Sequence, residues 1–327
     1  MKEIDEKKFE EFEEFEELND KELATRIKNV SKLDYVTEKY IENLKTILIH
    51  PCYSEKAHFK VARIHLPVAP KCNIQCKYCK RDINKVENRP GVSSGIMKPK
   101  EALKFIDESI KKMPSLKIAG IAGPGEPLAN HETIETFKLV KKKYPDVKLC
   151  LATNGLELPN MVNTLADINV ANITITINSV DPEIFDQIYE FVNFNGIRYT
   201  GMEAGKILLE NQLRGIELAS RKGILVRINT VLIPTINFNQ THLIAKEALD
   251  RGAILQNIMP LIPIYAFKHF KRPTRKEMFD ARNASRKFLP QFKVCKQCRA
   301  DAVGIPGTTL RKQRCEDDPI SHIIFHG

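Results

Sequence analysis

The sequence predicts an incomplete (β/α) barrel of six parallel strands, and two observations support this fold class. From residue 60 to residue 289, short runs rich in β-branched residues alternate with helical segments. Strands that alternate with helices form parallel βαβ units, and six units fall two short of a closed eight-stranded barrel. The length of 327 residues and a composition of 43% hydrophobic and 28% charged residues suit one barrel with a sizeable core.

The expected elements form a regular series along the chain. Apolar residues recur at helical spacing in residues 1–47, which predicts an acidic helical arm. Residues 290–327 lack periodicity and predict an irregular tail, so the barrel occupies residues 48–289. Within the barrel, the predicted elements are strand 61–69, helix 99–113, strand 116–122, helix 131–143, strand 147–153, helix 159–167, strand 172–178, helical region 181–222, strand 224–233, helix 239–251, strand 254–261 and helix 274–289.

Charge is unevenly distributed over the chain, whose formal net charge is +10. Residues 1–23 contain four Lys and eleven Asp or Glu, so the rest of the chain is strongly basic. We expect the acidic arm to be solvated, with docking on the basic body as the alternative. A basic body suits either nucleic acid or an anionic cofactor. The chain has no Trp and no nucleic-acid-binding motif, so no nucleic-acid partner is expected.

The cysteine content and the lack of long apolar runs indicate the compartment. No apolar run approaches the ~20 residues of a membrane span, and no secretion signal is visible. We therefore expect a cytoplasmic protein that does not contact a membrane. Eight cysteines in such a protein indicate metal ligands rather than disulfides.

Three cysteines follow the first predicted strand with the spacing C-x3-C-x2-C: Cys72, Cys76 and Cys79. Three thiolates on one tight loop can bind three irons of a four-iron cluster and leave the fourth iron open to a substrate. A zinc loop is the alternative, but zinc usually takes four ligands arranged in C-x2-C pairs. The spacing resembles the motif of the radical S-adenosylmethionine (SAM) superfamily, in which the open iron chelates the amino and carboxylate groups of SAM. This resemblance implies a partial barrel of the radical SAM type.

Polar residues and glycines stand at the predicted strand ends, where barrel enzymes carry their chemistry. Residues 119–127 resemble the Gly-Gly-Glu-Pro turn of the superfamily, which implies contact with SAM, although such a turn alone is more often only a turn. Arg227 is expected to neutralise an anionic ligand, with a buried ion pair as the alternative. The candidate cofactor-binding residues are Tyr78, Gly123, Gly125, Glu126, Asn154, Thr176, Asn178, Arg227 and Asn229.

Further metal ligands remain beyond the three-cysteine loop. Cys295 and Cys298 form a C-x2-C pair, a recurring geometry for two ligands of one metal centre, with structural zinc as the alternative. His50 and Cys52 stand two residues apart before the first strand, and both suit iron. Cys150 alternates with apolar neighbours, so a buried structural thiol is its alternative role.

Several blocks in one order are similar to the NifB family of nitrogenase cofactor maturases. They span residues 50–304 and read HPCYSE from 50, PVAPKCNIQC from 67, RPGV from 89, GIAGPG from 120, TITIN from 174, NIMPL from 257 and CKQCRADAVG from 295. The resemblance implies an enzyme that methylates a cluster sulfide with one SAM and abstracts hydrogen with a 5′-deoxyadenosyl radical from a second. The methyl carbon then becomes a carbide while two four-iron clusters fuse into the eight-iron precursor of the iron–molybdenum cofactor.

The resemblance also implies ligands and partners. The three-cysteine loop would hold the SAM cluster. Cys52 and Cys150, with His50, would hold one precursor cluster. Cys295 and Cys298, the implied catalytic residues, would help hold the other. The implied partners are an iron–sulfur cluster donor, a cofactor carrier or scaffold protein, and an electron donor such as a ferredoxin. Many relatives carry a fused cluster-carrier domain that is not found here, and Cys315 and the acidic arm have no counterpart in the family pattern.

Two other functions compete with this one. A GTP-cyclising radical SAM enzyme of molybdopterin synthesis also has a partial barrel and a C-terminal cysteine trio, which Cys295, Cys298 and Cys315 imitate. That function leaves Cys52 and Cys150 without a role. A non-catalytic iron–sulfur scaffold would bind clusters without cleaving SAM, so a search for 5′-deoxyadenosine separates it from the enzyme.

Overall fold

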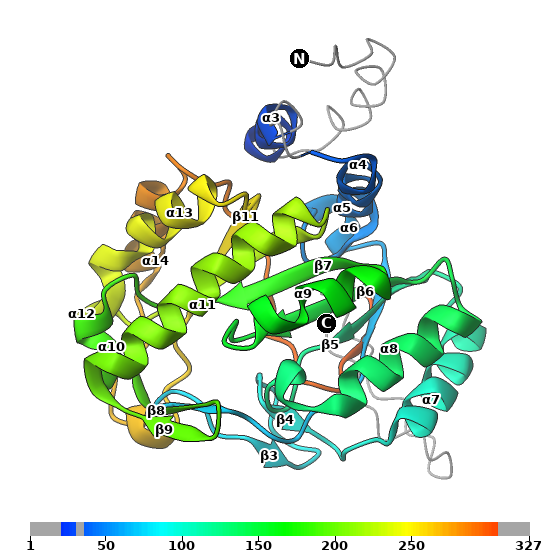
Figure 1. Cartoon of the computed structure of the whole chain (residues 1–327), viewed down its shortest axis with the longest axis horizontal. Coiled ribbons are helices and arrows are strands. Elements are labelled where there is room, and N and C mark those ends of the chain that lie inside the picture. The colour runs from blue at the N-terminus through cyan, green and yellow to red at the C-terminus, as the bar shows by residue number, and fades with distance from the viewer. Residues whose placement is uncertain (1–20, 31–35, 307–327) are drawn as a thin grey trace.

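A computed structural model of the chain describes residues 21–30 and 36–306. Its main feature is a curled sheet of seven strands in the order β11-β10-β7-β6-β5-β1-β12 (Figure 1). The first six are parallel to their neighbours, and they follow the chain order from β1 to β11. The predicted six-stranded partial barrel is therefore confirmed. The strands are β1 Ala62–His65, β5 Leu116–Ile121, β6 Lys148–Thr153, β7 Val170–Thr176, β10 Leu225–Leu232, β11 Leu255–Pro260 and the antiparallel edge strand β12 Val303–Gly304.

Helices on the outer face connect the parallel strands. α7 has Pro99 at its first position, where proline needs no hydrogen-bond partner for its nitrogen. α14 begins with a capping box in which Thr274 and Glu277 bond each other's backbone. The connecting helices are α7 Pro99–Lys112, α8 His131–Lys143, α9 Leu158–Asp167, α11 Gly201–Arg221, α12 Pro234–Asn237, α13 Thr241–Asp250 and α14 Arg275–Ser285, with short 3-10 turns η1 Pro127–Ala129, η3 Phe238–Gln240 and η4 Tyr265–Phe267.

The region 181–222 is not continuously helical as predicted. It contains η2 Pro182–Ile184, α10 Phe185–Ile188 and the hairpin β8 Tyr189–Phe194 and β9 Ile197–Tyr199 before α11. Asn195 and Gly196 form the hairpin turn, and both have the positive φ of a type I′ turn. The hairpin pairs with β2 Ile74–Cys76 in a second, three-stranded sheet. This sheet fixes the three-cysteine loop.

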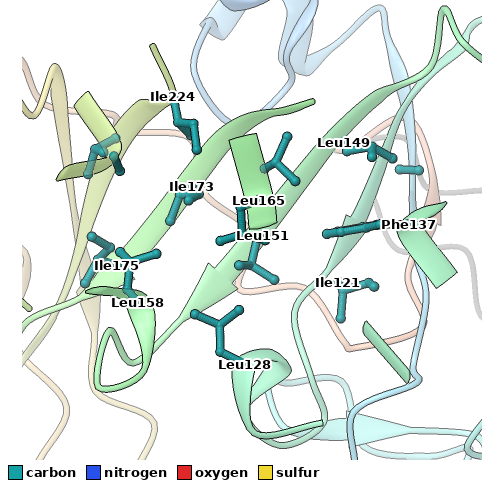
Figure 2. Close-up of a cluster of buried hydrophobic side chains, with 14 of the residues drawn as sticks. Ile121, Leu128, Phe137, Leu149, Leu151, Leu158, Leu165, Ile173, Ile175 and Ile224 are labelled. Atoms are coloured by element: carbon teal, nitrogen blue, oxygen red, sulfur yellow. The ribbon is translucent and has the colours of Figure 1, made fainter. Parts of the chain in front are cut away.

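The main core lies between the sheet and its outer helices. Alternate residues of β6 and β7, such as Leu149, Leu151 and Ile173, bury their side chains there (Figure 2). Phe137 of α8 and Leu165 of α9 pack against them. Because the apolar residues of these strands face the helices, the residues between them face the interior of the barrel.

The N-terminal helices cover one end of the barrel. Leu23, Ile27 and Tyr40 form a second buried cluster with Leu225 and Leu255, the first residues of β10 and β11. The described helices of the arm are therefore docked on the barrel, and the prediction of a solvated acidic segment is not tested. Residues 1–20 and 31–35, which include most of the acidic segment, lie outside the described residues. The helices of this part are α3 Lys21–Val30, α4 Glu38–Leu44, α5 Thr46–Ile49 and α6 Glu55–His58.

The remaining described segments are short. β3 Asp82–Ile83 and β4 Val92–Ser93 form a parallel pair after the cysteine loop. The C-terminal segment to residue 306 is irregular except for β12, as predicted, and Cys315 lies outside the described residues. In the part of the chain that the structure describes, no helix combines the length and the apolar character needed to cross a membrane.

Candidate functional site

All seven cysteines of the described residues line one cavity, with a volume of about 290 Å³. The cavity lies inside the curled sheet, and side chains from β6, β7 and β10 contribute to its wall. None of these cysteines is in a disulfide. The cavity thus brings together sulfur atoms from four separate parts of the sequence. The lining cysteines are Cys52, Cys72, Cys76, Cys79, Cys150, Cys295 and Cys298.

The three-cysteine loop is held by backbone hydrogen bonds. The amide of Cys79 donates to the carbonyl of Cys76 at 3.0 Å, which closes a tight turn between them. The side-chain amide of Gln75 donates to the carbonyl of Cys76 at 3.0 Å and to the carbonyl of Cys79 at 3.1 Å. The amide of Lys77 donates to Ile188 at 2.9 Å, next to the hairpin. The loop is therefore preorganised with its thiols toward the cavity.

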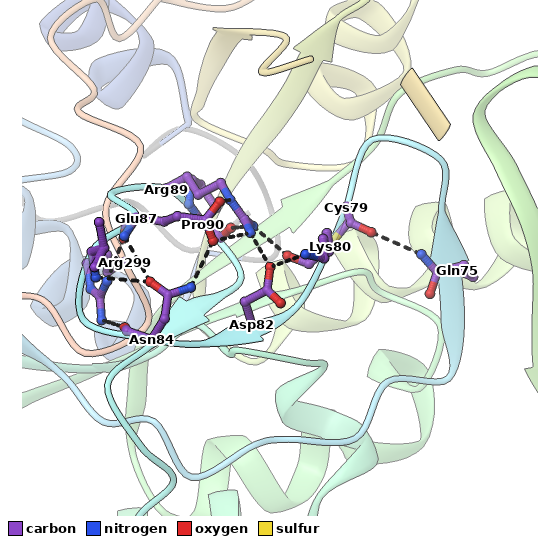
Figure 3. A network of polar contacts seen from close by, with 10 residues as sticks. Gln75, Cys79, Lys80, Asp82, Asn84, Glu87, Arg89, Pro90 and Arg299 are labelled. Atoms are coloured by element: carbon purple, nitrogen blue, oxygen red, sulfur yellow. Dashed lines mark hydrogen bonds and ion pairs between the residues drawn. The ribbon is translucent and has the colours of Figure 1, made fainter. Parts of the chain in front are cut away.

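A polar network joins this loop to the C-terminal segment (Figure 3). Arg89 pairs with Asp82 at 2.6 Å and also donates to the carbonyl of Lys80, directly after the loop. Arg299 pairs with Asp301 at 2.8 Å and donates to the carbonyls of Asn84 and Glu87. Segment 80–90 therefore connects the two cysteine groups at the cavity.

The glycine-rich turn packs against the backbone of the cysteine loop. The amide of Gly125 donates to Ala69 at 2.7 Å, and the amide of Glu126 donates to Lys71 at 2.8 Å. A Cβ added to Gly125 would lie 2.3 Å from the Lys71 oxygen, so no larger residue fits there. Close approach of two backbones is the requirement that glycine meets.

The buried Glu126 carboxylate ties this turn to the end of β6. It accepts hydrogen bonds from the Thr153 hydroxyl at 2.6 Å, the Asn154 amide at 2.7 Å and the Leu128 amide at 3.0 Å. Burial raises the pKa of Glu126 to about 7, although the three donors act in the opposite direction. The carboxylate therefore fixes the glycine-rich turn to the end of β6 in the cavity wall.

The predicted cofactor-binding residues divide into two groups. Seven of them line the cavity, namely Tyr78, Gly125, Glu126, Asn154, Thr176, Arg227 and Asn229. Gly123 and Asn178 lie outside its lining. The Asn178 amide donates to the Tyr78 hydroxyl at 2.7 Å and to the Tyr189 hydroxyl at 2.9 Å. Asn178 thus orients Tyr78 and Tyr189, and it reaches the cavity only through these two rings, which both line it.

His65, which the sequence analysis did not select, lies next to Cys150. A Cβ added to Gly120 of β5 would stand 2.8 Å from the Cys150 sulfur and 3.3 Å from Cδ2 of His65. Both side chains therefore occupy the space that this glycine leaves between β1 and β6. Its place at the end of the first barrel strand is the sequence signal that could have identified His65.

The hydrogen bonds of the two cavity histidines give them different tautomers. Nδ1 of His65 is 3.0 Å from the carbonyl of Arg299, which can only accept, so Nδ1 carries the proton and Nε2 has the lone pair. Nδ1 of His50 instead accepts from the Cys52 amide at 3.1 Å, which places the proton on Nε2. A histidine ligand typically donates its other ring nitrogen to a carbonyl or carboxylate. His65 has this arrangement, and His50 does not.

The C-terminal pair is presented by a turn in which Gln297 has a φ of 51°. The side-chain amide of Gln297 donates to the carbonyl of Pro260 at the end of β11, at 2.9 Å. Behind the pair, Nη2 of Arg63 donates to the sulfur of Cys298 at 2.9 Å. Cys295 and Cys298 thus share one wall of the cavity with the strand ends.

The donor set fits iron–sulfur clusters better than a single metal ion. Burial raises the pKa of the Cys72 thiol to about 11 and that of Cys150 to about 12, so each must lose a proton to bind iron. Within the described ranges, no three His, Cys, Asp or Glu side chains are grouped closely enough to hold one ion. A four-iron cluster needs wider spacing, since each thiolate binds a different iron.

Comparison with known families agrees with this site. Residues 66–248 match the model of the radical SAM superfamily, and this range contains the three-cysteine loop, the glycine-rich turn and Cys150. With its partial barrel and its loop of three unpaired cysteines, the chain is a radical SAM enzyme. A four-iron cluster and SAM are the cofactors of that class.

Two relatives define the family within the class. The FeMo cofactor biosynthesis protein NifB of Methanocaldococcus jannaschii is 47% identical over 259 residues, which cover 79% of this chain and 86% of that protein. NifB of Klebsiella pneumoniae is 43% identical over 272 residues, 81% of this chain and 58% of that protein. The chain belongs to the NifB family. The GTP-cyclising and scaffold alternatives are therefore not supported.

Proposed function

We propose that this chain binds three iron–sulfur clusters in one cavity and fuses two of them into a carbon-containing eight-iron core. This core would be a precursor of the nitrogenase iron–molybdenum cofactor. The observation that carries the proposal is the gathering of seven free cysteines from four separate segments around a single cavity. A radical SAM enzyme with one cluster would use only three of them.

Cys72, Cys76 and Cys79 would hold the resident cluster, and the glycine-rich turn that packs against this loop at the cavity would bind the amino end of SAM. When bound, the cluster and SAM supply the radical chemistry for methyl transfer and hydrogen abstraction. The protein's own residues fix the geometry. Gln75 holds the loop carbonyls, and Asn178 orients Tyr78 on the cavity wall.

The two precursor clusters are substrates, and different walls of the cavity would bind them. Cys52 and Cys150 would bind one, with His65 as the third ligand in place of His50, because its Nε2 has the free lone pair. Cys295 and Cys298 would bind the other. Two or three protein ligands leave irons open on each precursor, which suits clusters that must react and leave.

Partners and compartment follow from this chemistry. A protein that consumes preformed clusters needs a cluster donor, and a product of eight irons needs a carrier or scaffold protein. Reductive cleavage of SAM needs an electron donor, for which a ferredoxin is suitable. We place the protein in the cytoplasm, where thiols remain reduced. The proposed organisation is an N-terminal arm (1–47), a barrel (48–289) and a cluster-binding tail (290–327).

Three cysteine variants test the proposal after anaerobic reconstitution. Cys72→Ala/Cys76→Ala/Cys79→Ala should abolish formation of 5′-deoxyadenosine under reductant. Cys52→Ala/Cys150→Ala and Cys295→Ala/Cys298→Ala should each remove about four irons per chain and abolish the eight-iron product. Wild-type iron content in both double variants would refute the precursor sites.

A further inference from the structure

Two buried arginines next to the cavity have no carboxylate partner among the described residues. Arg63 is 1% exposed and Arg227 is 6% exposed, and Nε of each has no hydrogen-bond partner. The other two buried arginines, Arg89 and Arg299, each pair with an aspartate. Two of the four buried arginines among the described residues therefore lack a counter-charge.

An unpaired guanidinium in a protein interior is costly, because burial removes its hydration and supplies no opposite charge. A fold that retains two of them next to metal-ligating cysteines needs negative charge at those cysteines. Thiolates and cluster sulfides supply such charge when iron is bound.

The contacts of Arg63 direct its charge at one sulfur. Nη1 donates to the carbonyl of Gly304 at 2.6 Å, which anchors the guanidinium to the edge strand. Nη2 donates to the sulfur of Cys298 at 2.9 Å. Arg63 itself is outside the lining of the cavity, so it acts from behind the cysteine. A hydrogen bond to a ligand sulfur makes a cluster easier to reduce.

We propose that Arg63 is the positioning residue of the substrate cluster held by Cys295 and Cys298, a role that rests on the proposed function. Its N–H group donates to the Cys298 thiolate, and its charge compensates the charge of the cluster. Both effects retain the cluster and raise its reduction potential.

Arg227 offers a matched control because its hydrogen bond is made to the segment of Cys52. Its Nη1 donates to the carbonyl of Cys52, and its guanidinium lies 5.4 Å from the ring centre of Tyr53 and 5.7 Å from that of Phe292. It is also buried and lacks a carboxylate partner among the described residues, but it contacts Cys52, a proposed ligand of the other precursor cluster. The two arginines should therefore affect different clusters.

The test uses the reconstituted full chain. The electron paramagnetic resonance signal that disappears in Cys298→Ala identifies the C-terminal cluster. In Arg63→Met, we expect that cluster to lose iron to a chelator about 10- to 100-fold faster and its potential to shift to a more negative value. Arg227→Met should leave this signal unchanged and shift the signal that is lost in Cys150→Ala.

Further variants separate charge from structure. Arg63→Lys keeps the charge and should restore the potential, whereas a purely structural role predicts the same loss of thermal stability in both variants and no change in potential. If Arg63→Met does not fold, Arg63→Gln retains a donor toward Gly304 and provides the neutral variant.

Two outcomes would overturn the inference, and they are distinguishable. If Cys298→Ala loses iron but neutral Arg63 variants keep the wild-type potential and retention, the inference is wrong and the proposed function stands. If Cys298→Ala loses no iron, no cluster is bound there, and the proposed site and the inference are both wrong.

Discussion

At the scale of single residues, hydrogen bonds on the imidazole rings distinguish the histidines that could serve as the proposed iron ligand. His50 and His65 both line the cavity, but only His65 presents an unprotonated Nε2. His58 has the same type of hydrogen bond as His65, to the carbonyl of Pro51 at 2.6 Å, but it is not part of the lining. Tautomer and position together are therefore our reasons to propose His65 as the ligand.

We predict that His65→Ala removes a nitrogen ligand from the precursor cluster of Cys52 and Cys150. The nitrogen hyperfine coupling of that cluster in pulsed electron paramagnetic resonance should disappear, and iron content should fall. His50→Ala and His58→Ala are the controls and should keep the coupling. Loss of the coupling in His50→Ala instead would restore His50 as the ligand.

At this scale, sequence reasoning identifies the cysteines as candidate ligands but does not identify His65. The spacing of Cys72, Cys76 and Cys79 is local, so it is visible in ten residues of sequence. The tautomer of His65 depends on the carbonyl of Arg299, which is 234 residues away. A contact between such distant residues has no local pattern.

At the scale of elements, the end of β5 and the end of β6 are joined through one buried carboxylate. Glu126 follows the glycine-rich turn and accepts hydrogen bonds from Thr153 and Asn154 at the end of β6. The glycine-rich turn also forms backbone hydrogen bonds with the start of the cysteine loop. Any change in the charge of Glu126 therefore acts on the fold around the SAM cluster.

The raised pKa of Glu126 predicts a pH dependence of stability. Its pKa rises from the ordinary 4.5 to about 7 in the folded chain, so the folded state binds more protons than the unfolded state between these values. The contribution of Glu126 to the free energy of unfolding is therefore complete below about pH 4.5 and is lost as the pH rises through 7. Relative to Glu126→Gln, the wild-type free energy of unfolding should fall by about 2–3 kcal/mol between pH 5 and 7. The same pH dependence of the free energy of unfolding in the wild type and in Glu126→Gln would contradict this prediction.

The hairpin of β8 and β9 shows where element prediction fails. The sequence contains the turn signal Asn195-Gly196 between aromatic and β-branched residues, but the surrounding segment also fits a long helix. Pairing with β2 decides between the two, and β2 is more than 100 residues earlier in the chain. By contrast, the six barrel strands are predictable because each is a compact apolar run.

At the scale of the whole molecule, the site depends on the connection between distant segments. Arg299 is fully buried, pairs with Asp301, and donates to carbonyls of the segment that follows the cysteine loop (Figure 3). The C-terminal cysteines are adjacent to it in sequence. Sequence motifs identify each cysteine group, whereas long-range contacts such as this network explain why the groups share one cavity.

We predict that Arg299→Met destabilises the fold by about 3–5 kcal/mol, because it leaves the Asp301 carboxylate buried and unpaired. Thermal or denaturant unfolding of the full chain measures the effect. Arg251→Met is the control. Its pair with Glu247 is partly exposed, so the change should be small. An equal loss in both variants would argue against a connecting role for Arg299.

The most direct test of the three-cluster cavity is the iron content of the wild-type chain after anaerobic reconstitution. Three four-iron clusters predict about twelve irons per chain, with the acid-labile sulfide to match. A reproducible value of about four irons per chain would mean that only the SAM cluster is bound, and it would contradict the account.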